Sequence, residues 1–186
     1  MNQNKKLSPA QKVSYTGLLF ALACVLSLVE NVITLPMMPG VKLGLANIVV
    51  MYAAFFLGRG QAFCLVILKS LFNLLTRGPV AGATSLCGGL FSLAIILLVA
   101  YLTKKKASYF ILSILGAVFH NLGQLFVARI MLTNAVTWLY LPVLLISGII
   151  MGSITSFSLK LVIPHLNKLG LTKAFISSKR HKDDVD

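Results

Sequence analysis

Hydrophobic residues along this chain form six long stretches, and short polar connections separate them. About 20 apolar residues in a helix cross the hydrocarbon core of a bilayer, and the stretches are close to that length. The predicted spans are Val13–Val29, Val41–Leu57, Gln61–Thr76, Val80–Leu102, Tyr109–Met131 and Val136–Ile163. The pattern therefore predicts an all-α, polytopic membrane protein with six transmembrane helices.

The connections between the spans leave no room for a second globular unit, so residues 1–186 are expected to form a single integral membrane domain. We expect an N-terminal segment over 1–12, a six-helix bundle over 13–163 and a basic tail over 164–186. The composition agrees, since 58% of the residues are hydrophobic and only 11% are charged. We therefore expect the lipid bilayer to surround most of the chain.

Most of the basic residues fall on one side of the predicted topology. An even number of spans places both termini on one side, and thirteen of the 17 lysines and arginines lie there. They are Lys5, Lys6, Lys12, Arg59, Lys104, Lys105, Lys106, Lys160, Lys168, Lys173, Lys179, Arg180 and Lys182. The positive-inside rule makes this side cytoplasmic, so we expect a multi-pass protein of the cell membrane with both termini inside. The net charge of +13 is then a topology signal and does not indicate nucleic acid.

The four remaining cations, Lys42, Lys69, Arg77 and Arg129, lie inside or at the rim of apolar spans, in the outer half of the bundle. A charged side chain at the centre of a bilayer costs about 2.5 to 3.5 kcal/mol on insertion scales, so such residues usually face a polar cavity or a ligand. Glu30 is the one acid near them in sequence. The set therefore indicates an anionic ligand, although Arg77 and Arg129 taken singly could instead extend to the outer headgroups.

The third span carries a polar face. Lys69, Asn73 and Arg77 are spaced four residues apart, which aligns them along one side of a helix. The fifth span is similar, and its polar residues are His120, Asn121, Gln124 and Arg129. Hydrogen bonding between helices is the alternative explanation for the amides, because Asn, Gln and His often join spans in this way.

The segment from Glu30 to Gly40 is predicted to be the first external loop. Pro36, Pro39 and Gly40 cannot continue a helix, while Met37 and Met38 are too apolar for a freely solvated linker. A lid over an external pocket would fit this composition. A loop lying on the lipid headgroups would fit it equally well.

Small residues repeat at helical spacing in two spans. Gly17 and Ala21 are four residues apart in the first span, and Gly148, Gly152 and Ser156 form a similar series in the sixth. Such stripes let helix backbones approach closely. Packing within the chain is the simpler interpretation, and docking of another membrane protein is the alternative.

Catalytic motifs are missing from the sequence. No Walker-type phosphate loop occurs, and the acidic residues are Glu30 and the tail residues Asp183, Asp184 and Asp186. A prenyl-diphosphate synthase would need clustered aspartates to hold magnesium. The three cysteines are isolated and His120 has no ligand neighbours in sequence, so no metal or cofactor is expected in this chain.

Two segments, Pro39–Asn47 and Gly116–Leu125, resemble signature segments of the Gx transporter family, which is also labelled heptaprenyl diphosphate synthase component I. Ser85–Gly89 and Tyr140–Pro142 are also similar to it, so the resemblance extends from the second span to the sixth. That family in turn resembles the substrate-binding S components of energy-coupling factor transporters, which are small six-span proteins that capture a solute from outside.

The resemblance to S components implies a transmembrane coupling protein and ATPase subunits as partners, with ATP used by those subunits. It implies docking of the coupling protein at Gly17 and Ala21, where the S-component pattern has alanine at both positions. It also implies a basic residue in the third span, for which Lys69 is the candidate. Lysine keeps the charge of the more usual arginine but loses its bidentate geometry.

These observations together predict a binding subunit for a small, anionic, partly hydrophobic solute of isoprenoid-like, quinone-precursor-like or flavin-like type. The predicted binding residues are Lys42, Asn47, Lys69, Asn73, Arg77, His120, Asn121, Gln124 and Arg129. One alternative is a membrane accessory subunit of heptaprenyl diphosphate synthase in isoprenoid or menaquinone side-chain synthesis. Another is a structural membrane protein whose cations bind anionic lipid headgroups.

Overall fold

A computed structural model of the protein describes residues 8–33, 45–103, 107–132, 139 and 141–168. This part of the chain contains six helices and no strand. The helices are α1 (Pro9–Ile33), α2 (Asn47–Phe56), α3 (Arg59–Arg77), α4 (Pro79–Leu102), α5 (Tyr109–Leu132) and α6 (Leu141–Lys168). The all-helical prediction is confirmed, and each predicted span overlaps one helix.

Four of the helices in the described ranges, α1, α4, α5 and α6, are long and apolar enough to cross a membrane. The nineteen residues of α3 would also reach across, but its buried polar face lowers its hydropathy. Helix α2 differs most from the prediction, because it begins at Asn47 after a turn at Leu45 and Ala46, whereas the predicted span began at Val41. Its ten residues extend about 15 Å, roughly half of the hydrocarbon core.

The expected first external loop begins later than the sequence indicated. Helix α1 continues to Ile33, so Glu30 belongs to its last turns, and its side chain is only 1% exposed. The prediction that the loop starts at Glu30 is therefore wrong. The helix continues because the first helix-breaking residue is Pro36, six positions further on. Residues 34–44, which include Lys42 and the predicted lid, lie outside the described part.

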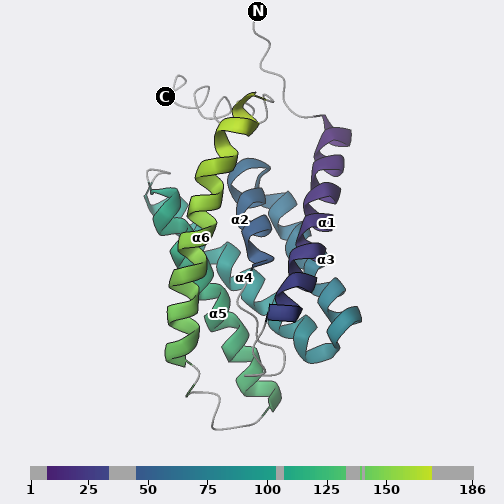
Figure 1. Ribbon diagram of the computed structural model, residues 1–186, viewed down its shortest axis with the longest axis vertical. Coiled ribbons are helices and arrows are strands. Elements are labelled where there is room, and N and C mark those ends of the chain that lie inside the picture. Colours follow the sequence, from purple (N-terminus) through teal and green to yellow (C-terminus); the bar gives the residue numbers. More distant parts are fainter. Residues whose placement is uncertain (1–7, 34–44, 104–106, 133–138, 140, 169–186) are drawn as a thin grey trace, which may run out of the picture.

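The helices form a bundle in which chain neighbours pack side by side from α3 to α6 (Figure 1). Helix α1 packs on α3 and α2. The start of α1 and the end of α6 lie at the same end of the bundle, and α2 occupies only the half nearest that end. This arrangement agrees with an even number of crossings. The side of the membrane on which that end lies stays a prediction.

Apolar side chains fill the interior of the half that contains α2. Val49 and Val50 of α2 pack with Leu65 and Val66 of α3, and Met51 belongs to a second cluster, which also includes residues of α4, α5 and α6. The outer faces of the helices are equally apolar. Large side chains such as Val13, Leu75, Ile146 and Phe157 are exposed. An apolar exterior around a core of this kind is the surface that lipid covers, as in a multi-pass membrane protein.

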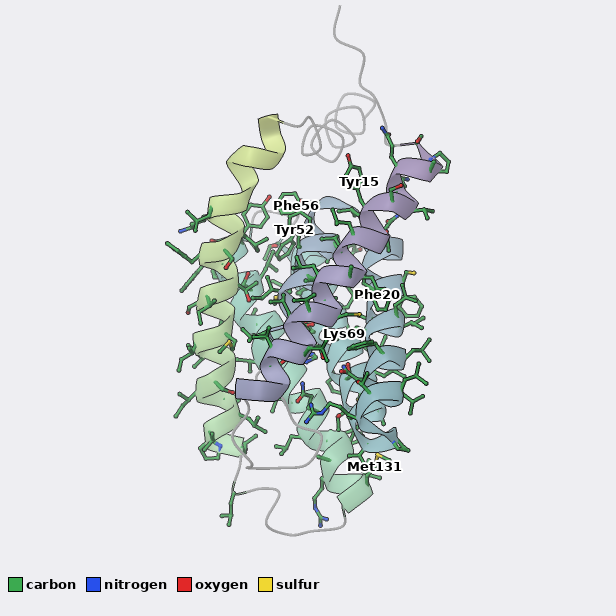
Figure 2. All side chains as sticks on the ribbon, turned by 45° about the vertical axis from the view of Figure 1, so that its right-hand side comes forward. Tyr15, Phe20, Tyr52, Phe56, Lys69 and Met131 are labelled. Atoms are coloured by element: carbon green, nitrogen blue, oxygen red, sulfur yellow. The ribbon has the colours of Figure 1, made fainter. Side chains whose placement is uncertain are left out.

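Tyrosines gather at the end of the bundle where α1 begins. Tyr15 and Tyr52 lie there in Figure 2, and the chain direction places Tyr101 near the end of α4 and Tyr109 at the start of α5 at that same end. The Tyr109 ring lies against Phe55, with the ring centroids 5.3 Å apart. Tyrosine is enriched where a bilayer meets water, so this belt marks one membrane interface.

Glycines on α6 permit close packing against α5. A Cβ atom added at Gly152 would lie 2.5 Å from the Ile114 Cα atom, and one added at Gly148 would lie 3.0 Å from the Val118 Cα atom. The stripe on α6 therefore serves contacts within the chain. Gly17 on α1 differs, because a Cβ atom there would meet nothing within 4 Å.

Candidate functional site

The polar face of α3 points into the bundle. Lys69 is 3% exposed, and Ser70 and Asn73 are buried beside it. The opposite face carries the exposed residues Leu71 and Leu75. Figure 2 shows Lys69 about halfway along the molecule, between Tyr52 and Phe56 at one end and Met131 at the other. The structure thus places the lysine deep in the bundle.

Asn73 joins three helices through its amide group. The Ser27 hydroxyl of α1 donates to Asn73 Oδ1 over 2.8 Å, and Asn73 Nδ2 donates to the Ser85 Oγ atom of α4 over 2.9 Å. This is the interhelical role that the sequence left open for the amides. Ser27 and Ser85 were not among the predicted site residues. Ser85 belongs to the Ser85–Gly89 segment that resembles the family, whereas Ser27 is a single serine in an apolar stretch and gives no such signal.

Replacing Asn73 with leucine is expected to lower the thermal stability of the detergent-purified protein. The change removes both hydrogen bonds but keeps the volume of the side chain, and interhelical bonds of this kind contribute about 0.6 to 2 kcal/mol. The midpoint of thermal unfolding should fall by about 2 to 8 °C. Thr76→Ala is the control, because the Thr76 hydroxyl is exposed and bonds only within its own helix. Equal midpoints for the two variants would contradict a stabilising bridge.

Glu30 and Arg77 lie one turn further along the same two helices. Helices α1 and α3 run in the same direction, so the step from Ser27 to Glu30 parallels the step from Asn73 to Arg77. Arg77 is partly buried, and its Nη1 atom is buried without a hydrogen-bond partner among the described residues. This nitrogen faces the interior, whereas a snorkelling arginine would direct its nitrogens to the surface.

His120 and Gln124 place a second polar surface opposite α4. The Gln124 Nε2 atom lies 2.7 Å from His120 Nε2. Both side chains contact α4 at Gly88, where an added Cβ atom would lie 2.9 Å from His120 Nδ1 and 2.9 Å from Gln124 Cγ. Helix α4 packs against both α3 and α5, and Lys69 of α3 is close enough for its positive charge to act on the His120 ring.

Asn47 is buried at the first position of α2, where its Nδ2 atom donates to the Ser92 Oγ atom of α4 over 3.1 Å. Met51, one turn later, touches Gly116 of α5, and His120 lies one turn further along α5. Since α2 and α5 run in opposite directions, Asn47 and His120 share one level of the bundle. We call Asn47, Lys69, His120 and Gln124 the central polar layer.

Asn121 and Arg129 do not belong to the central polar layer. Asn121 points to α6, where its Nδ2 atom donates to the Leu144 carbonyl over 2.8 Å and to the Ser147 hydroxyl over 3.0 Å. Arg129 is partly exposed in the last turn of α5. Asn121 and Arg129 are eight residues apart, so they lie on a strip of α5 next to the one that carries His120 and Gln124. The position of α6 decides which way that strip faces.

The central polar layer is a positively charged, hydrogen-bonding surface enclosed by apolar side chains. Lys69 supplies the charge, while Asn47, His120 and Gln124 supply polar groups from two other helices. Such a set can bind an oxyanion, since charge-assisted hydrogen bonds strengthen where water is excluded. Within the described ranges, no three His, Cys, Asp or Glu side chains gather as metal ligands would.

Comparison with known proteins gives a family for the chain. No curated protein and no solved structure matches it. The model of one protein family, described as heptaprenyl diphosphate synthase component I, matches residues 19–162, which include the second half of α1, the whole of α2 to α5 and most of α6. This protein is therefore a member of the heptaprenyl diphosphate synthase component I family.

Proposed function

We propose that this protein is the substrate-binding membrane subunit of a transporter of the energy-coupling-factor type. It captures a small, anionic, partly hydrophobic solute from outside the cell. The observation that carries the proposal is the burial of Lys69 at mid-depth, next to polar groups of α2 and α5. An ionisable side chain inside a membrane bundle marks a functional site by default, and the positive charge of Lys69 would attract the anionic group of a ligand.

Apolar side chains beside the central polar layer would have to move apart to hold the hydrophobic part of the solute, because they pack against one another in this structure. Ile96 of α4, Leu112 of α5 and Leu159 of α6 are buried around Met51. A polar head group near Lys69 and a hydrocarbon or ring portion among these side chains would suit an isoprenoid-like, quinone-precursor-like or flavin-like compound. The charge of Arg77 would add to that of Lys69 on the side of the layer where α3 ends.

The test is mass spectrometry of the ligand retained by protein extracted from its native membrane in a mild detergent. We expect an anionic compound in stoichiometric amount, together with a transmembrane coupling protein and ATPase subunits. Protein that carries only exchangeable phospholipid, with no ATPase subunits, would contradict the proposal and support a structural role at the lipid headgroups.

The family to which the chain belongs supports a second candidate, an accessory subunit of heptaprenyl diphosphate synthase. In this role the chain would hold a soluble catalytic subunit at the bilayer or take up its product, and the layer around Lys69 would bind a diphosphate group. Copurification with a prenyltransferase and without ATPase subunits would favour this candidate. The composition of the purified complex thus separates the two functions.

Partner docking is proposed for the outer face of α1, around Gly17 and Ala21. Both residues are exposed, and the space beside Gly17 is open. Gly17→Leu and Ala21→Leu are expected to prevent copurification of the coupling protein, because a bulky side chain keeps two helices apart at a small-residue contact. The retained ligand should be unchanged. Leu18→Ala on the same face is the control, since it makes no new obstruction, and normal assembly of both leucine variants would place the docking surface elsewhere.

A further inference from the structure

Helix α2 is a half-length helix that begins inside the bundle. Its ten residues, which include Tyr52 and Phe56, lie in the half of the molecule where α1 begins and α6 ends. The N-terminus of α2 therefore lies near mid-depth (Figures 1 and 2). The first backbone N–H groups of a helix point along its axis and carry a partial positive charge. In membrane transporters, the N-termini of interrupted helices point at anionic groups of the substrate.

Polar side chains surround this N-terminus. Asn47 at its first position shares a level with His120, and the charge of Lys69 acts on the His120 ring. The start of α2, the Lys69 ammonium group and the His120 imidazole thus belong to one layer contributed by three helices. Each of them favours negative charge or a hydrogen-bond acceptor at that depth.

Asn47 supplies a second observation that points to a ligand. Its side chain is 2% exposed, and its Oδ1 atom has no hydrogen-bond partner within the described structure. The Ser92 hydroxyl accepts a hydrogen bond from Asn47 Nδ2 in this orientation of the amide, but a hydroxyl can equally donate one. Turning the amide by 180° keeps the bond to Ser92 and presents an N–H group in place of the unpartnered oxygen. In that orientation Asn47 donates to an anion at the start of α2.

His120 adds another buried donor. Its side chain is 3% exposed, and Nδ1 lies beside the backbone of Gly88 without forming a hydrogen bond of good geometry with any described residue. When the Gln124 amide donates to Nε2, the neutral ring carries its proton on Nδ1. The buried N–H group then lies in the same layer as Asn47. Two side-chain donors, a helix N-terminus and a lysine make a built site for an oxyanion.

We infer that the N-terminus of α2 seats the anionic group of the ligand, a phosphate or a carboxylate of a soluble molecule. Asn47 and His120 donate hydrogen bonds to it, and Lys69 balances its charge. This inference rests on the proposed capture of an anionic solute and adds where its anionic group binds. It also gives a reason for α2 to begin at mid-depth. A helix that began earlier in the chain would place its own backbone where the anion binds.

The test is Asn47→Asp, which keeps the size of the side chain and brings a negative charge to the site. Aspartate is well tolerated in the first turn of a helix, so the fold should persist. The full chain in detergent is titrated with sodium diphosphate and with sodium citrate at constant ionic strength, and ligand-induced thermal stabilisation is measured. We expect one of the two anions to stabilise the natural protein and to bind Asn47→Asp about 30-fold or more weakly.

Gln11→Glu is the matched control, because it adds the same charge at an exposed position of α1 and should bind the anion normally. Asn47→Ser replaces Asn47→Asp if the aspartate variant does not fold. If the Asn47 variant bound the anion as tightly as the natural protein while Lys69→Met lost binding, the anion would not bind at the start of α2. The proposed function would remain intact. Stabilisation by phosphatidylglycerol in mixed micelles but by neither soluble anion would overturn both.

Discussion

Lys69→Ala is expected to abolish retention of the anionic ligand through detergent purification, while the protein still inserts into the membrane. Lys69 is 3% exposed and lies at mid-depth, so its ammonium group would act on a bound anion with little screening by water. Removing one partner of a buried, hydrogen-bonded charge pair costs about 2 to 5 kcal/mol of binding free energy. The affinity should therefore fall about 30-fold at least, as measured by titration of the purified variant with the identified ligand.

Two companion variants decide whether the loss comes from the charge. Lys69→Arg keeps the charge and should retain a measurable part of the affinity for the ligand, although the guanidinium group differs in shape from the ammonium group. Lys160→Ala removes an exposed lysine of α6 and should bind normally. Size-exclusion chromatography of each variant checks its fold. Full affinity in a well-folded Lys69→Ala protein would remove the main support for an anion site in the bundle.

Gly152→Ala is expected to destabilise the bundle more than any other single-methyl change on α6. The added Cβ atom would lie 2.5 Å from Ile114 Cα and 2.9 Å from Ser113 O, which are backbone atoms that cannot rotate away. Relief requires α6 to shift away from α5, and overpacking of this kind costs about 1 to 3 kcal/mol. The midpoint of thermal unfolding should fall by about 2 to 12 °C.

Gly17→Ala is the matched control for Gly152→Ala, and its expected effect has the opposite sign. The same methyl group is added to a helix, but at Gly17 it meets open space, and alanine favours the helix over glycine by about 1 kcal/mol in water. The isolated protein should be as stable as the natural one or slightly more stable. If the midpoint of thermal unfolding of Gly152→Ala were no lower than that of Gly17→Ala, α6 would pack on α5 differently from this structure.

The helices could be predicted from the sequence because their apolar stretches have few interruptions. Each predicted span overlaps an observed helix, and the spacing of Lys69, Asn73 and Arg77 placed them on one helix face, on which Lys69 and Asn73 are buried. The shortness of α2 could not be predicted, because Val41 and Leu43 extend the apolar pattern past the residue where the helix begins. Hydropathy indicates which residues are stable in contact with lipid, but it does not indicate where a helix begins or where the backbone turns.

The central polar layer was only partly predictable. Asn47, His120 and Gln124 were expected near Lys69 because polar residues are rare in apolar spans. Asn121 was expected there too, but it bonds to Leu144 and Ser147 of α6. Two adjacent residues on a helix point about 100° apart, so one of the pair His120 and Asn121 had to face a different neighbour. Only the position of α6 relative to α5 decides which of them does so.

The hydrogen bond from Ser27 to Asn73 has a consequence for the order of synthesis. Its two partners are 46 positions apart in the chain, so Ser27 leaves the ribosome well before Asn73, which accepts its hydrogen bond. At about 5 to 20 residues per second, that interval lasts about 2 to 9 seconds. During this time α1, which carries the acid Glu30, has already been made, while α3, on which it packs in the folded protein, has not. We therefore expect the polar groups of the first helix to need other partners, in the insertion machinery or in water, until the third helix has been made.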